Sequence, residues 1–115
     1  GIYIARINKN TNFNLISKEV INNQVIFIAT QKGYGGEIKA KVVFENNKLV
    51  DYEIISHNET KERYSLIEKN DYINQIKNNY NNLDGVDTVS SATITSKALK
   101  DLIKNVMEVQ KWKIF

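Results

Sequence analysis

The feature that most constrains the fold is a pair of strand-like segments joined by Asn46-Asn47. The first segment alternates apolar with polar side chains, the period-2 pattern of a strand with one buried face. Its apolar positions are Ile38, Ala40, Val42 and Phe44. The second segment, Leu49 to Ser56, resumes a strand pattern. Asparagine tolerates the positive φ angles of a tight two-residue turn, so the sequence predicts an antiparallel hairpin here.

Two further strands are expected upstream of the hairpin. The run from Gln24 to Thr30 is rich in β-branched and aromatic residues and leads to a glycine turn at Gly33-Tyr34-Gly35-Gly36. The opening residues Ile2 to Ile16 also read as a strand, although its boundaries are poorly signalled. We therefore expect an antiparallel sheet built around residues 24 to 57.

Helical periodicity is expected in two places. Between Lys61 and Leu83, apolar residues at helical spacing predict one short helix after a cap at Asn70 or Asp71. The segment from Ser96 to about Gln110 follows the amphipathic pattern, with Thr95 or Ser96 as its cap. The fold class predicted is α+β, an antiparallel β-sheet with a C-terminal amphipathic helix and a shorter helix packed against it.

Composition excludes several functions. A chain of 115 residues is long enough for one domain, so residues 1–115 are interpreted as a single domain. The chain has no cysteine, which rules out disulfides, thiolate metal sites and Fe–S clusters, and the lone His57 argues against any other metal site. The net charge of +3 is scattered along the chain, so nucleic acid is not an expected partner. No run of apolar residues is long enough for a membrane span, and Gly1 to Arg6 lack the pattern of a secretory signal.

The segment from Asp87 to Ser96 is rich in hydroxyl side chains and nearly free of bulky ones. One interpretation is a loop with an ordinary Ser/Thr helix cap. The other is a phosphate site, because small side chains leave room and a helix N-terminus stabilises negative charge. A hydrolase built from Ser90 or Ser91, His57 and Asp87 lacks the G-x-S-x-G turn.

The same segment resembles the flavinylation motif of the bacterial FMN-binding domain family, which includes domains of the Rnf complex G subunit and of the sodium-translocating NADH:quinone reductase C subunit. In that motif an Asp precedes a hydroxyl residue, a small residue, Ala and the acceptor Thr. The matching residues are Asp87, Ser90, Ala92 and Thr93, followed by Thr95-Ser96. Upstream, Gly33 to Ile38 and Ser56 to Thr60 resemble the same domain, so the likeness covers about residues 25 to 107.

The resemblance implies an electron-transfer domain with FMN joined through its phosphate to Thr93, and with no catalytic residue of its own. It implies a separate flavin transferase that uses FAD and Mg²⁺, with the motif as its recognition sequence. It also implies an extracytoplasmic location, anchorage to the membrane or cell surface through a segment outside these residues, and redox partner proteins or a quinone-linked membrane complex. The cofactor-binding residues are then Thr93, Asp87, Ser90, Ser91, Ala92, Thr95, Ser96, Tyr34, Glu59 and Thr60.

The sequence departs from the family pattern at two places. Lys61-Glu62-Arg63-Tyr64 stands where Rnf-type subunits have Pro-Gly-Leu-Gly, which favours a stand-alone or tandem module. Ser91 stands where the family has Gly, and we expect a backbone there that is compatible with serine. The rival hypothesis is a cofactor-free binding or scaffolding module of the same fold that has lost modification because of Ser91. Tyr34 is open to a second interpretation, as an ordinary rim aromatic.

Overall fold

Four strands of the described chain form one antiparallel sheet in the order β1-β2-β3-β4, in a computed structural model that describes residues 12–112. The strands are β1 Phe13–Ile21, β2 Gln24–Lys32, β3 Glu37–Glu45 and β4 Lys48–Ser56. Asn46 and Asn47 both have positive φ, 53° and 66°, as a tight hairpin turn requires. The predicted hairpin and antiparallel sheet are therefore confirmed.

The first strand differs from its expected limits. Residues 2–11 of the expected strand lie outside the described residues, and β1 continues past Ile16 to Ile21. It pairs with β2, with a register irregularity between Leu15 and Ser17. The expected end at Ile16 was wrong because an edge strand with an exposed second half lacks the clear alternation of a half-buried strand.

Helices α2 Lys61–Lys69, α3 Tyr72–Asn78 and α4 Thr93–Trp112, with the 3-10 helix η1 Tyr80–Gly85, complete the described chain. Where one short helix was expected, the structure has two α-helices and most of η1. Helix α2 begins after Thr60, whose side chain accepts a hydrogen bond from the Arg63 N–H at 3.3 Å. Asp71 precedes α3 as expected, but its φ of 50° is left-handed and its side chain caps no backbone N–H.

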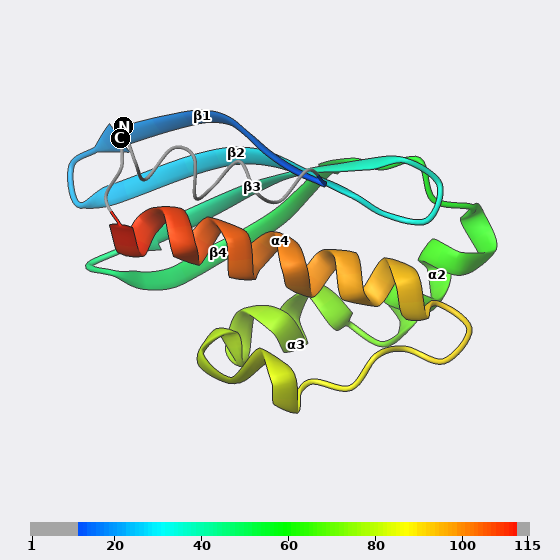
Figure 1. Cartoon of the computed structure of the whole chain (residues 1–115). Coiled ribbons are helices and arrows are strands. Elements are labelled where there is room, and N and C mark those ends of the chain that lie inside the picture. Colours follow the sequence, from blue (N-terminus) through cyan, green and yellow to red (C-terminus); the bar gives the residue numbers. More distant parts are fainter. Residues whose placement is uncertain (1–11, 113–115) are drawn as a thin grey trace.

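Helix α4 packs along one face of the sheet (Figure 1). The side chains at this interface are fully buried, and burial of each large one stabilises the fold by about 1.5–3 kcal/mol. They include Phe27, Ile38 and Val42 from the sheet and Leu99, Leu102, Ile103 and Val106 from α4. The buried Tyr52 hydroxyl of β4 donates to the Leu99 carbonyl at 2.9 Å. Because α4 is fixed in this way, its first turn and the loop before it have a defined place against the sheet.

Candidate functional site

Helix α4 begins at Thr93, three residues before the expected start at Ser96. The Ala92 carbonyl accepts the first helical hydrogen bond, from the Ser96 N–H at 2.9 Å. The expected cap at Thr95 or Ser96 is therefore wrong, because both residues lie inside the helix. Their hydroxyls have partners in other segments, which offset the weaker helix propensity of Ser and Thr.

We call residues 86–92, the loop that leads into α4, the motif arch. Its second end is held by Ser96, whose fully buried hydroxyl accepts from the Val89 N–H at 3.0 Å and donates to the Ala92 carbonyl at 2.7 Å. The Ala92 N–H donates to the Val89 carbonyl at 3.0 Å. Residues 89 to 92 thus form a hydrogen-bonded turn that is attached to α4 through Ser96.

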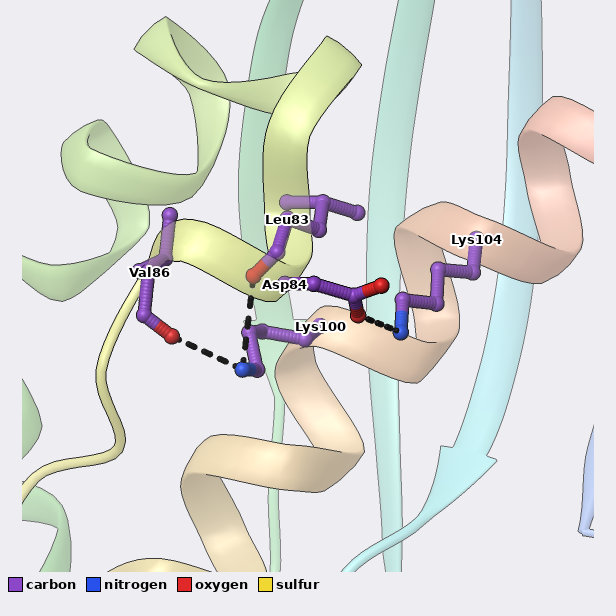
Figure 2. Close-up of polar contacts among 5 residues, drawn as sticks. All are labelled: Leu83, Asp84, Val86, Lys100 and Lys104. Carbon is purple, nitrogen blue, oxygen red and sulfur yellow. Dashed lines mark hydrogen bonds and ion pairs between the residues drawn. The ribbon is translucent and has the colours of Figure 1, made fainter.

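The first end of the motif arch is held by Lys100 (Figure 2). The Lys100 ammonium donates to the Val86 carbonyl at 2.8 Å and lies 3.4 Å from the Leu83 carbonyl. One turn further along α4, Lys104 forms an ion pair with Asp84 at 2.8 Å. The segment before the motif is therefore attached to α4 by two lysines.

The hydroxyl residues of the predicted site differ in their exposure to solvent. Thr95 and Ser96 are both 0% exposed, as is Ala92. Thr93, by contrast, is exposed at the first position of α4. Among the three hydroxyls at the start of the helix, Thr93 is the one that another molecule can reach.

Asp87, Ser90 and Ser91 lie on the motif arch, and all three are exposed. Asp87 and Ser90 border a surface hollow of about 420 Å³ that the arch shares with α2 and α3. Its lining also includes Thr88, Val89, Leu66, Asn70, Tyr72 and Gln75. A second hollow, of about 450 Å³, lies against η1 and the later part of α4 and contains no residue of the motif.

Glu59 joins the glycine turn to α4. The residue is 7% exposed, and its carboxylate accepts hydrogen bonds from the Tyr34 N–H at 2.9 Å and the Gly35 N–H at 2.7 Å. The Thr95 hydroxyl donates to the same carboxylate at 2.5 Å. The structure thus brings together three residues that the sequence placed in the site, Tyr34, Glu59 and Thr95.

The charge of Glu59 follows from these contacts. Burial alone raises the pKa of the carboxyl, but the hydrogen bonds and the nearby His57 lower it, and the net result is a pKa below the ordinary 4.5. Glu59 is therefore ionised at neutral pH. A buried carboxylate with three donors is a structural anchor, because most of its lone pairs already accept hydrogen bonds from two separate segments.

Two glycines make the approach to Glu59 possible. A Cβ at Gly35 would stand 2.1 Å from the Asn58 carbonyl oxygen, and one at Gly33 would stand 2.7 Å from a Glu59 carboxylate oxygen. Neither position accepts a side chain without movement of its neighbours. The glycine turn is thus required for packing as well as for its bend.

Tyr34 and Thr60 lie beside this anchor. The Tyr34 side chain is 56% exposed, and the Arg63 guanidinium lies 3.9 Å from its ring centroid. Thr60 caps α2, which begins at the next residue, Lys61. Its hydroxyl also lies 3.4 Å from an Arg63 guanidinium nitrogen.

Ser91 has a φ of 69°, in the left-handed region. The expectation of a backbone compatible with serine is therefore wrong. An L-residue with a Cβ is disfavoured there by about 1–2 kcal/mol, whereas glycine is not. The glycine that the resemblance leads one to expect here would adopt this φ without that cost.

Sequence reasoning missed Lys100. Lys97, Lys100 and Lys104 all read as solvated positions of an amphipathic helix, and nothing in their spacing marks the one that binds the arch. It also missed the direct contact between Glu59 and Thr95, which are separated by 36 positions. Within residues 12–112, no group of acidic and His side chains could hold a metal ion. No helix in the described range has both the length and the hydropathy of a membrane span.

We predict that Glu59→Gln lowers the free energy of unfolding at pH 7 by about 1.5–3 kcal/mol, because an amide group cannot accept from both backbone N–H groups and Thr95. The folded-state pKa of Glu59 is depressed, so its stabilisation is present above the ordinary pKa of 4.5 and is lost as pH falls through the lower folded value. The difference between wild type and variant should therefore shrink in acid. Urea unfolding from pH 7 to pH 3, with the exposed Glu19→Gln as control, measures it. Parallel curves for wild type and Glu59→Gln would contradict the assignment.

Comparison with known proteins agrees with this site. The sequence model of the FMN-binding domain family matches residues 33–108, which include the glycine turn, Glu59, the motif arch and most of α4. The G subunit of the proton-translocating ferredoxin:NAD(+) oxidoreductase complex of Clostridium ljungdahlii is 33% identical over 91 residues, which cover 70% of this chain and 49% of the relative. The chain thus spans about half the length of that relative. On these matches and this architecture, the chain belongs to the FMN-binding domain family.

Proposed function

We propose that this domain is an electron carrier whose FMN is attached by a phosphoester bond to Thr93. The observation that carries the proposal is the exposure of the Thr93 hydroxyl, next to two buried and hydrogen-bonded hydroxyls in the same helical turn. Membership of the FMN-binding domain family supports the cofactor.

The residues present fit a phosphate at this position. The Ser96 N–H makes the first hydrogen bond of α4, so the N–H groups of residues 93–95 precede the helical ladder at the positive end of the helix dipole. Ala92 is fully buried and its methyl group takes no room at the surface. A negatively charged phosphodiester on the Thr93 oxygen would be stabilised there.

Attachment requires an outside enzyme in this proposal. The Thr93 oxygen would form a bond to the flavin-side phosphorus of FAD, the pyrophosphate bond would break, and AMP would leave. The hydroxyl proton must pass to a base. Glu59 is unsuited to that role because Thr95 and two backbone N–H groups already occupy its oxygens. A flavin transferase with Mg²⁺ would supply the base and neutralise the phosphates, with Asp87 and Ser90 on the motif arch as parts of its recognition sequence.

Once bound, FMN would supply the redox chemistry, since its ring accepts and releases electrons. The protein would fix the phosphate, and the exposed Tyr34 with Arg63 offers an aromatic and cationic surface beside the same corner. We place the domain outside the cytoplasm, held at the membrane or cell surface through another segment, as a stand-alone or tandem module. Its partners would be redox proteins or a quinone-linked membrane complex, in line with the relative that belongs to an oxidoreductase complex.

The direct test is the intact mass after co-expression with a flavin transferase. A carrier gains the mass of one FMN minus water and stays yellow after denaturation. The same domain from a host without the transferase should be folded and colourless. An unmodified mass in both hosts would favour the rival function, a cofactor-free binding or scaffolding module.

We predict that Thr93→Val abolishes covalent flavin and leaves the melting temperature nearly unchanged, because the exposed hydroxyl is the attachment atom and valine keeps its shape. Thr88→Val, which removes another exposed hydroxyl of the arch, is the matched control and should still be modified. Peptide mass mapping locates the flavin. Covalent FMN retained by Thr93→Val would refute the assignment of the acceptor.

We predict that Asp87→Ala slows flavinylation strongly but changes the free energy of unfolding by no more than about 0.5 kcal/mol, as is usual for an exposed side chain. Asp84→Ala is the control, since Asp84 is also exposed, lies three positions earlier and pairs with Lys104. Modification time courses and urea unfolding of both variants separate the two effects. A large loss of stability with normal flavin occupancy would show that Asp87 is structural.

We predict that Ser91→Gly speeds flavinylation and leaves stability equal or higher. Relief of left-handed strain favours glycine by about 1–2 kcal/mol, and the larger unfolded ensemble of glycine opposes it by up to about 1 kcal/mol. Asn46 is also left-handed (φ 53°) but lies in the distant hairpin, so Asn46→Gly serves as the control. It should change stability without changing the rate of modification. Equal rates for wild type and Ser91→Gly under limiting transferase would show that the left-handed serine does not limit modification.

A further inference from the structure

We infer that Lys100 is a positioning residue for the modification of Thr93, because it holds the first end of the motif arch in the shape that the transferase must bind. This inference rests on the proposed function and adds a residue that the motif does not contain. Lys100 lies on α4 two turns beyond Thr93, so its side chain acts through the arch and not at the acceptor itself.

The contacts of Lys100 are directed at the backbone just before the motif. Its half-buried ammonium donates to the Val86 carbonyl at 2.8 Å and lies 3.4 Å from the Leu83 carbonyl (Figure 2). These carbonyls stand at the end of η1, and Val86 immediately precedes Asp87. The ammonium therefore fixes the point at which the recognition residues begin.

Lys100 and Ser96 divide the arch between them. Ser96 holds Val89 and Ala92 through its hydroxyl, and Lys100 holds Val86. Residues 87 and 88 therefore lie between two backbone segments that are each hydrogen-bonded to a side chain of α4. Without the Lys100 contact, Asp87 would no longer keep a constant position relative to Thr93.

Lys104 provides an internal comparison. It lies one turn along the same helix and pairs with the side chain of Asp84, which is 89% exposed. An exposed pair of this kind contributes little to stability, and it holds no carbonyl of the arch. Loss of the Lys104 ammonium should therefore leave the arch in place, although it removes the same charge from the same helix.

The expected change in KM follows from the fraction of molecules in which the motif arch has the shape that the transferase binds. If Lys100→Met leaves only a fraction of molecules with the competent arch, the transferase binds that fraction, and its apparent affinity falls by the same factor. The transfer step itself would proceed normally in the bound complex. A loss at Lys100 should thus raise KM and leave kcat nearly unchanged. Reversible loss of folded protein would raise KM in the same way, so the assay is run where every variant is folded, and hydrogen exchange distinguishes a local change from a global one.

The experiment compares wild type, Lys100→Met, Lys100→Arg and Lys104→Met as substrates of a flavin transferase with FAD and Mg²⁺, well below their melting temperatures. Methionine keeps the unbranched stem of lysine and removes the charge, whereas arginine retains donors for both carbonyls. We expect KM to rise at least fivefold for Lys100→Met and to stay within twofold of wild type for the other two. Hydrogen exchange on the unmodified proteins should show faster exchange in Lys100→Met at the Val86 amide, which donates to the Leu83 carbonyl at 3.0 Å, with the core of α4 unchanged.

The outcomes are distinct. An unchanged KM for Lys100→Met, an equal effect of Lys104→Met, or exchange that accelerates throughout α4 would overturn the role given to Lys100, with the flavin proposal intact. A wild-type domain that the transferase leaves unmodified would overturn the proposed function, and the role of Lys100 with it. A raised KM that Lys100→Arg restores, together with faster exchange confined to the arch, supports the inference.

Discussion

The site depends on one buried carboxylate. Glu59 lies between the glycine turn and the first turn of α4, and its ionised form binds both. Burial of an ion is unfavourable unless donors replace the lost water, and two backbone N–H groups with the Thr95 hydroxyl do so here. The arrangement requires Gly35, because a Cβ there would collide with the Asn58 backbone. The glycine turn, Glu59 and Thr95 are therefore parts of one interaction, although they are far apart in the sequence.

Three polar side chains of helix α4 bind Glu59 and the two ends of the motif arch. Thr95 binds Glu59, Ser96 binds the second end of the motif arch, and Lys100 binds its first end. The apolar side chains of the same helix fix it on the sheet. One rigid helix therefore fixes the position of the glycine turn relative to the motif arch, which a flexible loop could not do.

Much of this architecture could be predicted because local patterns determine it. The alternation in β3 and the Asn46-Asn47 turn specify the hairpin, and the apolar spacing after residue 96 specifies most of α4. The start of α4 could not be predicted in the same way. Thr95 and Ser96 have the side chains of helix caps, and only their tertiary partners place them inside the helix. The second short helix depends on the cap at Thr60, a signal that is weak without the neighbouring structure.

The accessibility of Thr93 follows from the phase of α4. The residues that are 0% exposed at the start of the helix are Ala92, Thr95, Ser96 and Leu99, which is the i, i+3, i+4, i+7 spacing of a face turned toward the core. Positions 93, 94 and 97 then face outward, and all three are exposed. The choice between neighbouring hydroxyls therefore needs no difference in their chemistry. The same apolar contacts that attach α4 to the sheet turn Thr95 and Ser96 inward and leave Thr93 at the surface, as the proposed phosphoester bond requires.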